Sequence, residues 1–273
     1  MKTISIVMTS SNRTKQTYYT LNSIKNSSYK DVHVVLVDDS TSDPIDFSIL
    51  KEYPFSIDFI KIKRENKNWS NPCVNYNIGF LFIKGGKVII QNAEVFHVGD
   101  VLAYVDENVN DTSYHVFDVK SSNSYDSNEK IYLHDNCNID IYNDPSIFNV
   151  GATEWYQCSK TNNRRFHFLT AMSLYTFNLF REFSYDYCFE GSYDDDDLVL
   201  KITSKNIPIV SVDHTISKCG GVHLYHVLAG NAWEKGCATN CLIFSKKLKY
   251  YHANNVYVEM SDSVFLYNKL MNS

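Results

Sequence analysis

The stretch ISIVMTSSNRTKQTYYTLNSIKNSSYKDVHVVLVDDS, residues 4–40, carries the pattern that decides the fold. The apolar run Ile4–Met8 and the β-branched run Val32–Val37 each have the length and composition of a buried β-strand. Between these two runs, apolar residues recur at helical spacing at Tyr18, Leu21 and Ile24. Strand, helix and strand in this order predict a right-handed βαβ unit with two parallel strands.

The same alternation continues through the first hundred residues. The sequence predicts further strands at Phe59–Ile62 and Lys87–Ile90, with a helix at Cys73–Ile83 between them. Strands that alternate with helices at this spacing form parallel sheets, because each helix carries the chain back to the same end of the sheet. We therefore expect an α/β fold with a mixed, mainly parallel sheet flanked by helices.

The middle of the chain has a different composition. Residues 105–150 are rich in Asn, Asp and Ser, and we expect an irregular insertion with short strands at Tyr114–Val119 and Lys130–Leu133. No segment has the Gly, Ser or Pro bias of a hinge. The prediction is a single domain over residues 1–273.

Composition and charge exclude several classes of protein. The 273 residues are 44% hydrophobic and carry a net charge of −5, which argues against a general binder of nucleic acid or anionic membranes. Every apolar run is shorter than the roughly 18 residues that cross a bilayer, and the N-terminal run is too short for a signal peptide. Seven scattered cysteines, an odd number, suit reduced thiols. We expect a cytoplasmic protein without a membrane span.

Polar residues follow three of the predicted strands. These segments are Thr9–Arg13, Asp38-Asp39 and Gln91–Glu94. In parallel sheets, ligands bind beyond the carboxyl ends of the strands. A solvated loop explains any one of these junctions equally well, but three of them with acidic or hydroxyl groups predict a shared ligand pocket.

The segment FEGSYDDDDLVLKI, residues 189–202, places four aspartates where a helix is expected to begin. The helix is predicted from Asp194 to about Asn206, because Pro208 prevents its continuation. Asp194 is then expected as the N-cap, with Asp197 in the capping-box position. These local roles account for two of the four carboxylates.

Helical periodicity separates the remaining two. The apolar residues of the inward face are Leu198, Val199 and Ile202. Asp195 lies three positions before the first of them and shares their face, whereas Asp196 is expected on the opposite arc together with Asp197. An inward carboxylate at a cleft suits a general base that removes a proton from an attacking hydroxyl, and we assign this role to Asp195.

A metal site is also indicated. Mg²⁺ and Mn²⁺ prefer oxygen ligands, and Mn²⁺ also accepts imidazole. Asn92 and Glu94, two positions apart after a strand, could supply oxygens, and His223 or His226 a nitrogen. An extended chain puts residues three positions apart on opposite faces, so only one of the two histidines is expected to bind.

Seven segments, in their order and spacing, carry a family resemblance. They are SIVMTSSNR, VVLVDDSTSD, ENKNWSNPCVNYNIGF, QNAEVFHVGDVL, WYQCSKTNNRRFHFLTAM, FSYDYCFEGSYDDDDLVLKI and GVHLYH. Together they resemble a family-two glycosyltransferase of the GT-A fold, a Rossmann-like fold. The nearest branch includes polypeptide N-acetylgalactosaminyltransferase- and galactosyltransferase-like domains.

The resemblance implies a nucleotide-binding half at residues 1–100 and an acceptor and catalytic half at residues 101–273. It implies a hexosyl- or N-acetylhexosaminyltransferase that inverts the anomeric carbon. The donor would be a UDP-sugar, the acceptor a glycan or protein hydroxyl, and the cofactor Mn²⁺ or Mg²⁺. The implied nucleotide-binding residues are Thr9, Ser11, Arg13, Asp38, Asp39, Asn66, Asn77 and Asn92.

The same resemblance implies the other site residues. The metal ligands would be Glu94, Asn92 and His223, with His226 as the alternative to His223, and the base would be Asp195. The acceptor-side candidates are Trp155, Tyr156, His167, Tyr193 and Asp194. For Trp155, Tyr156 and His167, packing in an aromatic-rich core is an equally good explanation.

Two departures from the family pattern leave alternatives open. Asn92 and Glu94 stand where two aspartates are common, and Asn75-Tyr76-Asn77 lacks the Arg that often precedes the Asn. A glycosyltransferase-like protein that binds nucleotide or glycan without turnover is therefore one alternative. A structural zinc site is another, although its spacing fits no standard site. Its ligands would be Cys219, His223, His226, Cys237 and Cys241.

Overall fold

The computed structural model describes residues 3–109, 112–134, 139–148, 154–189, 191–227 and 232–260. The strands are β1 (Ile4–Ser10), β2 (Val32–Asp38), β3 (Ser56–Lys61), β4 (Lys87–Asn92), β5 (Val95–Val98), β6 (Tyr114–Phe117), β7 (Val119–Ser121), β8 (Trp155–Gln157), β9 (Leu169–Ser173), β10 (Ile209–Val212) and β11 (Gly220–His223). The α-helices are α1 (Thr14–Lys25), α2 (Phe47–Leu50), α3 (Cys73–Phe80), α4 (Val101–Asn108), α5 (Tyr125–Leu133), α6 (Leu174–Phe180), α7 (Asp194–Ser204), α8 (His214–Ser217) and α9 (Ala232–Asn254). Short 3₁₀ helices are η1 (Arg64–Asn66), η2 (Ile139–Asn143) and η4 (Tyr185–Tyr187).

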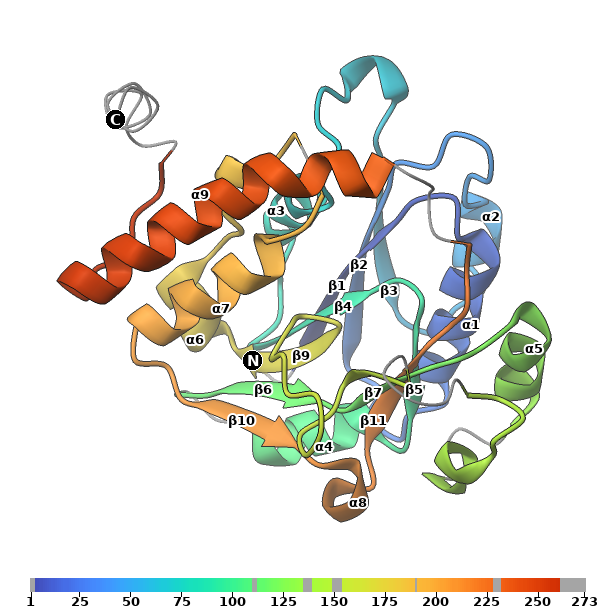
Figure 1. The fold of residues 1–273 in the computed structure, drawn as a ribbon. Coiled ribbons are helices and arrows are strands. Elements are labelled where there is room, and N and C mark those ends of the chain that lie inside the picture. The colour runs from blue at the N-terminus through green and yellow to red at the C-terminus, as the bar shows by residue number, and fades with distance from the viewer. Residues whose placement is uncertain are drawn as a thin grey trace.

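The strands form two sheets (Figure 1). The main sheet has seven strands in the order β10-β6-β9-β4-β1-β2-β3, and the smaller one has four in the order β5-β11-β7-β8. In the main sheet, β1 runs parallel to both β2 and β4, β2 runs parallel to β3, and β9 is antiparallel to its neighbours β4 and β6. The expected mixed, mainly parallel sheet is confirmed.

Helices cover both faces of the main sheet. Ile6 of β1 and Leu36 of β2 point to the face covered by α1 and α4, and Val7 and Val35 point to the face covered by α3, α6 and α7. Because successive side chains alternate between two buried faces, these strands read as continuous apolar runs. The sheet therefore lies at the centre of a three-layer arrangement.

The predicted insertion is more regular than its composition indicated. Tyr114–Phe117 forms β6, which joins the main sheet, and Val119–Ser121 forms β7 of the smaller sheet. The strand expected at Lys130–Leu133 is wrong, because these residues end helix α5. Ser124 caps this helix by accepting a hydrogen bond from the Ser127 N–H at 3.1 Å.

Helix α9 lies across α7 in Figure 1, so that α7 has neighbours on two sides. Among the described residues, no helix combines the length and the apolar character needed to cross a membrane.

Candidate functional site

The carboxyl ends of β1, β2 and β4 lie flush. Thr9 is opposite Asn92 in the pairing of β1 with β4, and Ser10 is opposite Asp38 in the pairing of β1 with β2. Glu94 follows β4 by two residues, and Arg13 precedes helix α1. These registers confirm that the polar segments after the strands share one edge of the sheet.

Glu94 is the centre of a buried charged cluster at this edge. Its side chain is 3% exposed, and its Oε1 lies 2.6 Å from Nη1 of Arg13. The Nε2 atoms of His223 and His226 each lie 3.5 Å from the same oxygen. Burial by itself would raise the pKa of Glu94, but Arg13 and the two histidines hold this pKa at about 2. Glu94 is therefore a carboxylate at neutral pH.

Both histidines reach Glu94, so the expectation that only one could do so is wrong. Asn128 on α5 holds the intervening Tyr225 at two points: its Oδ1 accepts from the Tyr225 N–H at 2.8 Å and its Nδ2 donates to the Tyr225 carbonyl at 2.8 Å. Gln16 on α1 donates to the same carbonyl at 3.0 Å. Strand β11 ends at His223, and both imidazoles face the carboxylate.

The cluster has the donor set and spacing of a divalent-cation site. Glu94, His223 and His226 offer one oxygen and two nitrogens that all lie within 4.8 Å of one another. Ligands that are each about 2.1 Å from one ion are separated by about 3 to 4 Å. Burial and the charge of Arg13 lower the pKa of His226 to about 4, which keeps its imidazole neutral, as a metal ligand must be.

Asn92 has a hydrogen-bond partner of its own at this edge. Its Oδ1 accepts from Oη of Tyr76 at 3.2 Å, and the same hydroxyl donates to the Gln91 carbonyl at 2.8 Å. Tyr76 is 1% exposed. The structure therefore brings Asn92 beside the tyrosine of α3.

Asp38, the last residue of β2, has a structural role. Asp38 is fully buried, and its carboxylate accepts from the backbone N–H groups of Ser40 at 3.1 Å and Ile45 at 3.4 Å. These bonds shape the turn that follows the strand. We correct the assignment of Asp38 to the nucleotide on this ground.

Asp39 has a different environment. Its Oδ2 accepts from Nδ2 of Asn75 at 2.7 Å and pairs with Nζ of Lys67. Burial alone would raise the pKa of Asp39, yet these two partners hold it below its usual range. In the described part of the chain, its Oδ1 is buried without a hydrogen-bond partner. An unpaired buried acceptor costs free energy, so this oxygen is a candidate to bind an N–H of a ligand.

Asn77 and Asn66 do not lie where a nucleotide-binding role would place them. Asn77 accepts from the N–H of Phe183 at 2.8 Å and donates to the Phe183 carbonyl at 2.9 Å, so its amide ties α3 to the chain before η4. Asn75 is therefore the asparagine of α3 that reaches Asp39, and Asn77 is corrected to a structural role. Asn66 is exposed at the end of η1.

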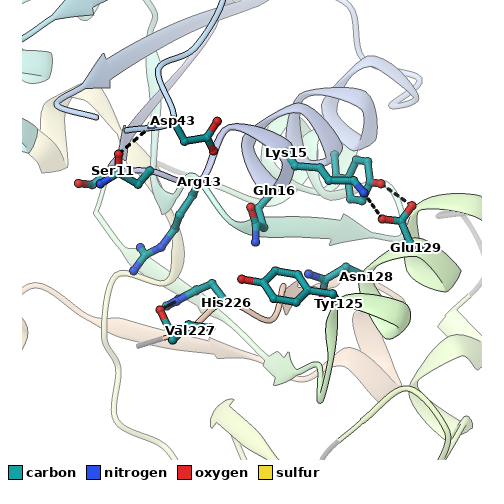
Figure 2. Close-up of a pocket in the computed structure, with 12 residues that line it drawn as sticks. Ser11, Arg13, Lys15, Gln16, Asp43, Tyr125, Asn128, Glu129, His226 and Val227 are labelled. Atoms are coloured by element: carbon teal, nitrogen blue, oxygen red, sulfur yellow. Dashed lines mark hydrogen bonds and ion pairs between the residues drawn. The ribbon is translucent and has the colours of Figure 1, made fainter. Parts of the chain in front are cut away.

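A cavity of about 500 Å³ opens beside the Glu94 cluster (Figure 2). Ser11, Arg13 and Gln16 line it from the start of α1, and Asn128 lines it from α5. His226 closes one side, so the cavity and the Glu94 cluster share a wall. Sequence reasoning missed Gln16 and Asn128. Both donate to the carbonyl of Tyr225, which lies 209 and 97 residues further along the chain, and a sequence pattern does not report so distant a contact.

The start of α7 differs from the predicted capping box. The helix begins at Asp194, and the preceding Tyr193 has a left-handed φ of 67° and makes no side-chain cap bond. Asp194 is 7% exposed and accepts from Nδ2 of Asn71 at 3.1 Å. Burial and the neighbouring Asp195 raise the pKa of Asp194 to about 6. Asp194 is therefore a buried acid and not the N-cap.

Asp197 is also buried, so its expected place on the outward arc is wrong. It is 1% exposed, accepts from Oη of Tyr187 at 3.1 Å and lies 2.9 Å from Nζ of Lys247 on α9. Helix α9 covers the face of α7 that would otherwise meet solvent. Helical periodicity could not reveal this, because it assumes one buried face.

Asp195 combines partial exposure with a charged partner. Its side chain is 22% exposed, and its Oδ1 forms a close ion pair with Nδ1 of His167. The ring of His167 lies 4.8 Å from that of Tyr76, which also contacts Asn92. Tyr76 thus separates the Asp195 pair from the strand ends.

The aromatic acceptor candidates have well-defined packing partners. Trp155 packs on Tyr142 and His214, with ring centroids 5.6 and 4.8 Å away, and belongs to the core around the smaller sheet. Tyr156 stacks on His223 at 4.1 Å and so supports the Glu94 cluster. The ring of Tyr193 stacks on that of Phe244 of α9 at 5.7 Å, beside the start of α7.

The proposed zinc site is not assembled among the described residues. Cys219 packs in the main core, and no cysteine joins the groups of potential metal ligands there. The side chain of Cys237 lies outside the described part. The second such group is Asp118, Asp213 and His214, in which Asp118 accepts from the N–H groups of Ser159 at 2.6 Å and His214 at 3.1 Å. That group has the bonding of a structural network.

Comparison with known proteins assigns the chain to a family. The sequence model of glycosyl transferase family 2 matches residues 5–189, which is more than half of the chain. The chain belongs to glycosyl transferase family 2. Its single-domain α/β architecture is the GT-A-like fold of these enzymes, and the family supports a glycosyltransferase activity.

Solved structures show the same fold. S. aureus TarS is 14% identical with a TM-score of 0.56, over 88% of this chain and 39% of TarS. TarS 1-349 in complex with UDP-GlcNAc is 13% identical with a TM-score of 0.55, over 98% of this chain and 77% of that one. The mannosyltransferase PcManGT from Pyrobaculum calidifontis, in complex with GDP-Man and Mn²⁺, is 12% identical with a TM-score of 0.54, over 90% of this chain and 64% of that one. The chain thus spans less than two thirds of the full TarS and PcManGT chains. No curated protein matches it in sequence.

Proposed function

We propose that the protein is a metal-dependent, inverting glycosyltransferase that moves a sugar from a UDP-sugar to a hydroxyl acceptor. One observation carries the proposal: Tyr76 lies between Asn92 at the strand ends, close to the candidate metal cluster, and the candidate base Asp195 with its partner His167. Its hydroxyl contacts Asn92 at the strand ends, two residues before Glu94, and its ring contacts His167, the partner of Asp195. A donor diphosphate at the first site and an acceptor hydroxyl at the second would thus be neighbours.

The chemistry of the ligands favours Mn²⁺ over Mg²⁺ as the cofactor. Glu94 supplies one hard oxygen, whereas His223 and His226 supply two imidazole nitrogens. Mg²⁺ is bound mainly through oxygen, and imidazole suits transition metals. Once bound, such an ion neutralises the negative charge that develops on a departing diphosphate. Arg13, beside Glu94, is a second positive group for the same phosphates.

The free oxygen of Asp39 supports a nucleobase with an imino N–H. A carboxylate accepts hydrogen bonds, so Oδ1 can bind the ring N–H of uracil or guanine. The complexes of TarS with UDP-GlcNAc and of PcManGT with GDP-Man contain bases of this kind. We propose uracil, in line with the resemblance of the Asp38-Asp39 segment, and Thr9 and Ser11 as further groups around the nucleoside.

The proposed reaction is a single displacement. The acceptor oxygen forms a bond to the anomeric carbon while the bond from that carbon to the phosphate oxygen breaks. The hydroxyl proton passes to Asp195, and the bonding electrons leave with the nucleoside diphosphate. Attack from the face opposite the diphosphate inverts the anomeric carbon.

The sugar and the acceptor follow from the family branch. The resemblance to the N-acetylgalactosaminyltransferase- and galactosyltransferase-like branch supports a hexose or N-acetylhexosamine as the transferred sugar, and a glycan or a protein hydroxyl as the acceptor. Tyr193 and Asp194, at the start of α7, are the proposed acceptor-side residues.

A second candidate function is nucleotide or glycan binding without turnover. The feature that favours it is Asn92, an amide where the family commonly has a carboxylate. The deciding experiment is a screen of UDP-, GDP-, ADP- and CDP-sugars for release of the nucleotide with Mn²⁺, with Mg²⁺ and with EDTA. Release of UDP that requires Mn²⁺ supports the transferase. Tight UDP binding without any release, with a panel of sugar acceptors present, supports the binding protein.

A further inference from the structure

His167 lies behind the candidate base and is almost completely buried. Its Nδ1 forms an ion pair with Oδ1 of Asp195, and its side chain is 5% exposed. The ring packs edge-on against Tyr76 and Phe183, with centroids 4.8 Å away in both cases. These rings fix the orientation of the imidazole. They also screen it from an acceptor, so the acceptor-side role predicted for His167 does not fit its position.

The ion pair of His167 and Asp195 has further negative groups beside it. Asp194 is 7% exposed and precedes Asp195, and Asp196 follows it. Adjacent carboxylates with little access to water repel each other, and both can be ionised only if a cation compensates them. Within the described residues, Asp195 has no ion pair other than that with His167.

We propose that His167 is a positioning residue for the base: its imidazolium compensates the charge of Asp195, occupies Oδ1 and leaves Oδ2 to accept the proton of the acceptor. The inference rests on the proposed glycosyl transfer. Oδ1 of Asp195 is buried although the side chain is 22% exposed, so the accessible part of the carboxylate lies away from His167. The acceptor proton moves to Oδ2, and His167 keeps its own proton throughout.

The electrostatics of the site agree with this role. Burial alone would lower the pKa of His167, but Asp195 and, in addition, Asp194 raise it above its ordinary value. The other titratable groups that face the pair are Tyr76 on α3 and Tyr114 on β6; burial raises both of their pKa values, so both are neutral. Burial and the charge of Asp195 raise the pKa of Asp196, whereas Arg164 lowers it.

The first test measures the pair without turnover. In an NMR titration of the histidine ring signals, with His167 assigned by its loss in His167→Gln, the midpoint of His167 should lie above that of free histidine. In Asp195→Asn it should fall by about one pH unit or more, because burial is then opposed only by the more weakly acting Asp194. Asp196→Asn, which removes the adjacent carboxylate, should change it far less. An unchanged midpoint in Asp195→Asn would overturn the pair.

The second test measures the effect on catalysis. In His167→Gln the pH below which the transfer rate declines should rise by about one unit, because Asp195 loses its counter-ion. In the double variant His167→Gln with Asp194→Asn, the pH below which the rate declines should move back toward that of the parent, since the repelling charge of Asp194 is removed. The control is His115→Gln, which alters another buried histidine, bonded to Ser113 at 2.9 Å. This control should leave the pH below which the rate declines unchanged.

The outcomes separate the two proposals. A uniform loss of rate in His167→Gln at every pH, without a shift of the pH below which the rate declines, would show a merely structural role and overturn the inference. Absence of transfer by the parent protein would overturn the proposed function, whereas the NMR midpoints would still decide whether His167 and Asp195 form the ion pair.

Discussion

At the scale of single residues, partners and exposure separate the acidic side chains. Asp38 and Asp197 are buried at 0% and 1%, and several donors hold each of them. Within the described ranges, Asp195 has one ion-pair partner, His167, and it is 22% exposed. A group that must exchange a proton with a substrate needs this access. The four aspartates at the start of α7 therefore differ in environment although they are identical in chemistry.

Asp195→Asn tests the assignment of the base. The amide keeps the shape of the side chain but cannot take a proton, so the transfer rate should fall by about 10²- to 10⁴-fold. UDP-sugar affinity and the thermal midpoint of unfolding should stay close to those of the parent. Asp196→Asn is the matched control and should retain most of the rate. Full activity in Asp195→Asn together with an inactive, folded Asp196→Asn would show that the base is Asp196 and not Asp195.

Glu94→Ala tests the metal cluster. It removes the one carboxylate among the three proposed ligands, so Mn²⁺-dependent binding of the UDP-sugar should be lost. The measurement is calorimetric titration of UDP with and without Mn²⁺. Asn92→Asp should instead tighten Mn²⁺, because it adds a second carboxylate. Glu129→Gln is a suitable control, because Glu129 lines the same cavity and pairs with Lys15. Parental Mn²⁺ and UDP affinity in Glu94→Ala would contradict the metal assignment.

At the scale of elements, α5 sets the geometry of a site to which it contributes no ligand. Asn128→Ala removes both hydrogen bonds to the backbone of Tyr225, and the two histidines should then lose their common orientation. Substitutions behind metal ligands typically weaken the metal by about 10- to 100-fold. Mn²⁺ affinity, measured by electron paramagnetic resonance, should fall in this range, whereas Asn108→Ala on α4 should leave it unchanged. Parental Mn²⁺ affinity in Asn128→Ala would show that the hydrogen bonds of Asn128 to Tyr225 do not position the histidines.

Helix α9 is held on α7 by a buried lysine. The side chain of Lys247 is 1% exposed and lies 2.9 Å from Asp197 and 3.0 Å from Asp186. Lys247→Met leaves these carboxylates without their shared cation, and removal of one partner of a buried pair costs about 3 to 5 kcal/mol. Denaturant unfolding should show a loss of this order. Lys249→Met, at an exposed position of the same helix, should have little effect. A similar free energy of unfolding in both variants would contradict the role of Lys247.

At the scale of the whole molecule, buried histidines should make stability depend on pH. Burial lowers the pKa values of His97 and His115 to about 4. The unfolded chain therefore binds protons that the folded protein does not, and stability should fall as the pH drops from about 6.5 toward 4, by roughly 1 to 2 kcal/mol for each histidine at pH 5. Asp194, with its pKa raised to about 6, acts in the opposite direction, as do His167, Asp196 and Asp197, whose pKa values are also raised.

Chemical denaturation at pH 7 and pH 5 measures this dependence. His115→Gln removes one of the titrating groups and should reduce the difference between the two pH values. Equal stability of the parent at pH 7 and pH 5 would contradict the prediction.

The local features of this protein follow from its amino-acid pattern. The runs Ile4–Met8 and Val32–Val37 became β1 and β2, because both faces of a central parallel sheet are buried and a continuous apolar run then has one stable place. The residues after these strands were brought to one edge for the same topological reason. The parallel pairing of these strands and the ligand edge therefore follow from short-range patterns.

Only the tertiary structure decided which of these residues act together. His223 and His226 converge because Asn128, far away in sequence, holds Tyr225, and Asp197 is buried because α9 covers it. His167 meets Asp195 through the packing of Tyr76 and Phe183. Periodicity describes one element and its own faces. The protonation and the partner of a side chain depend on groups that other elements bring within a few ångströms, and the distance between residues along the chain does not contain that information.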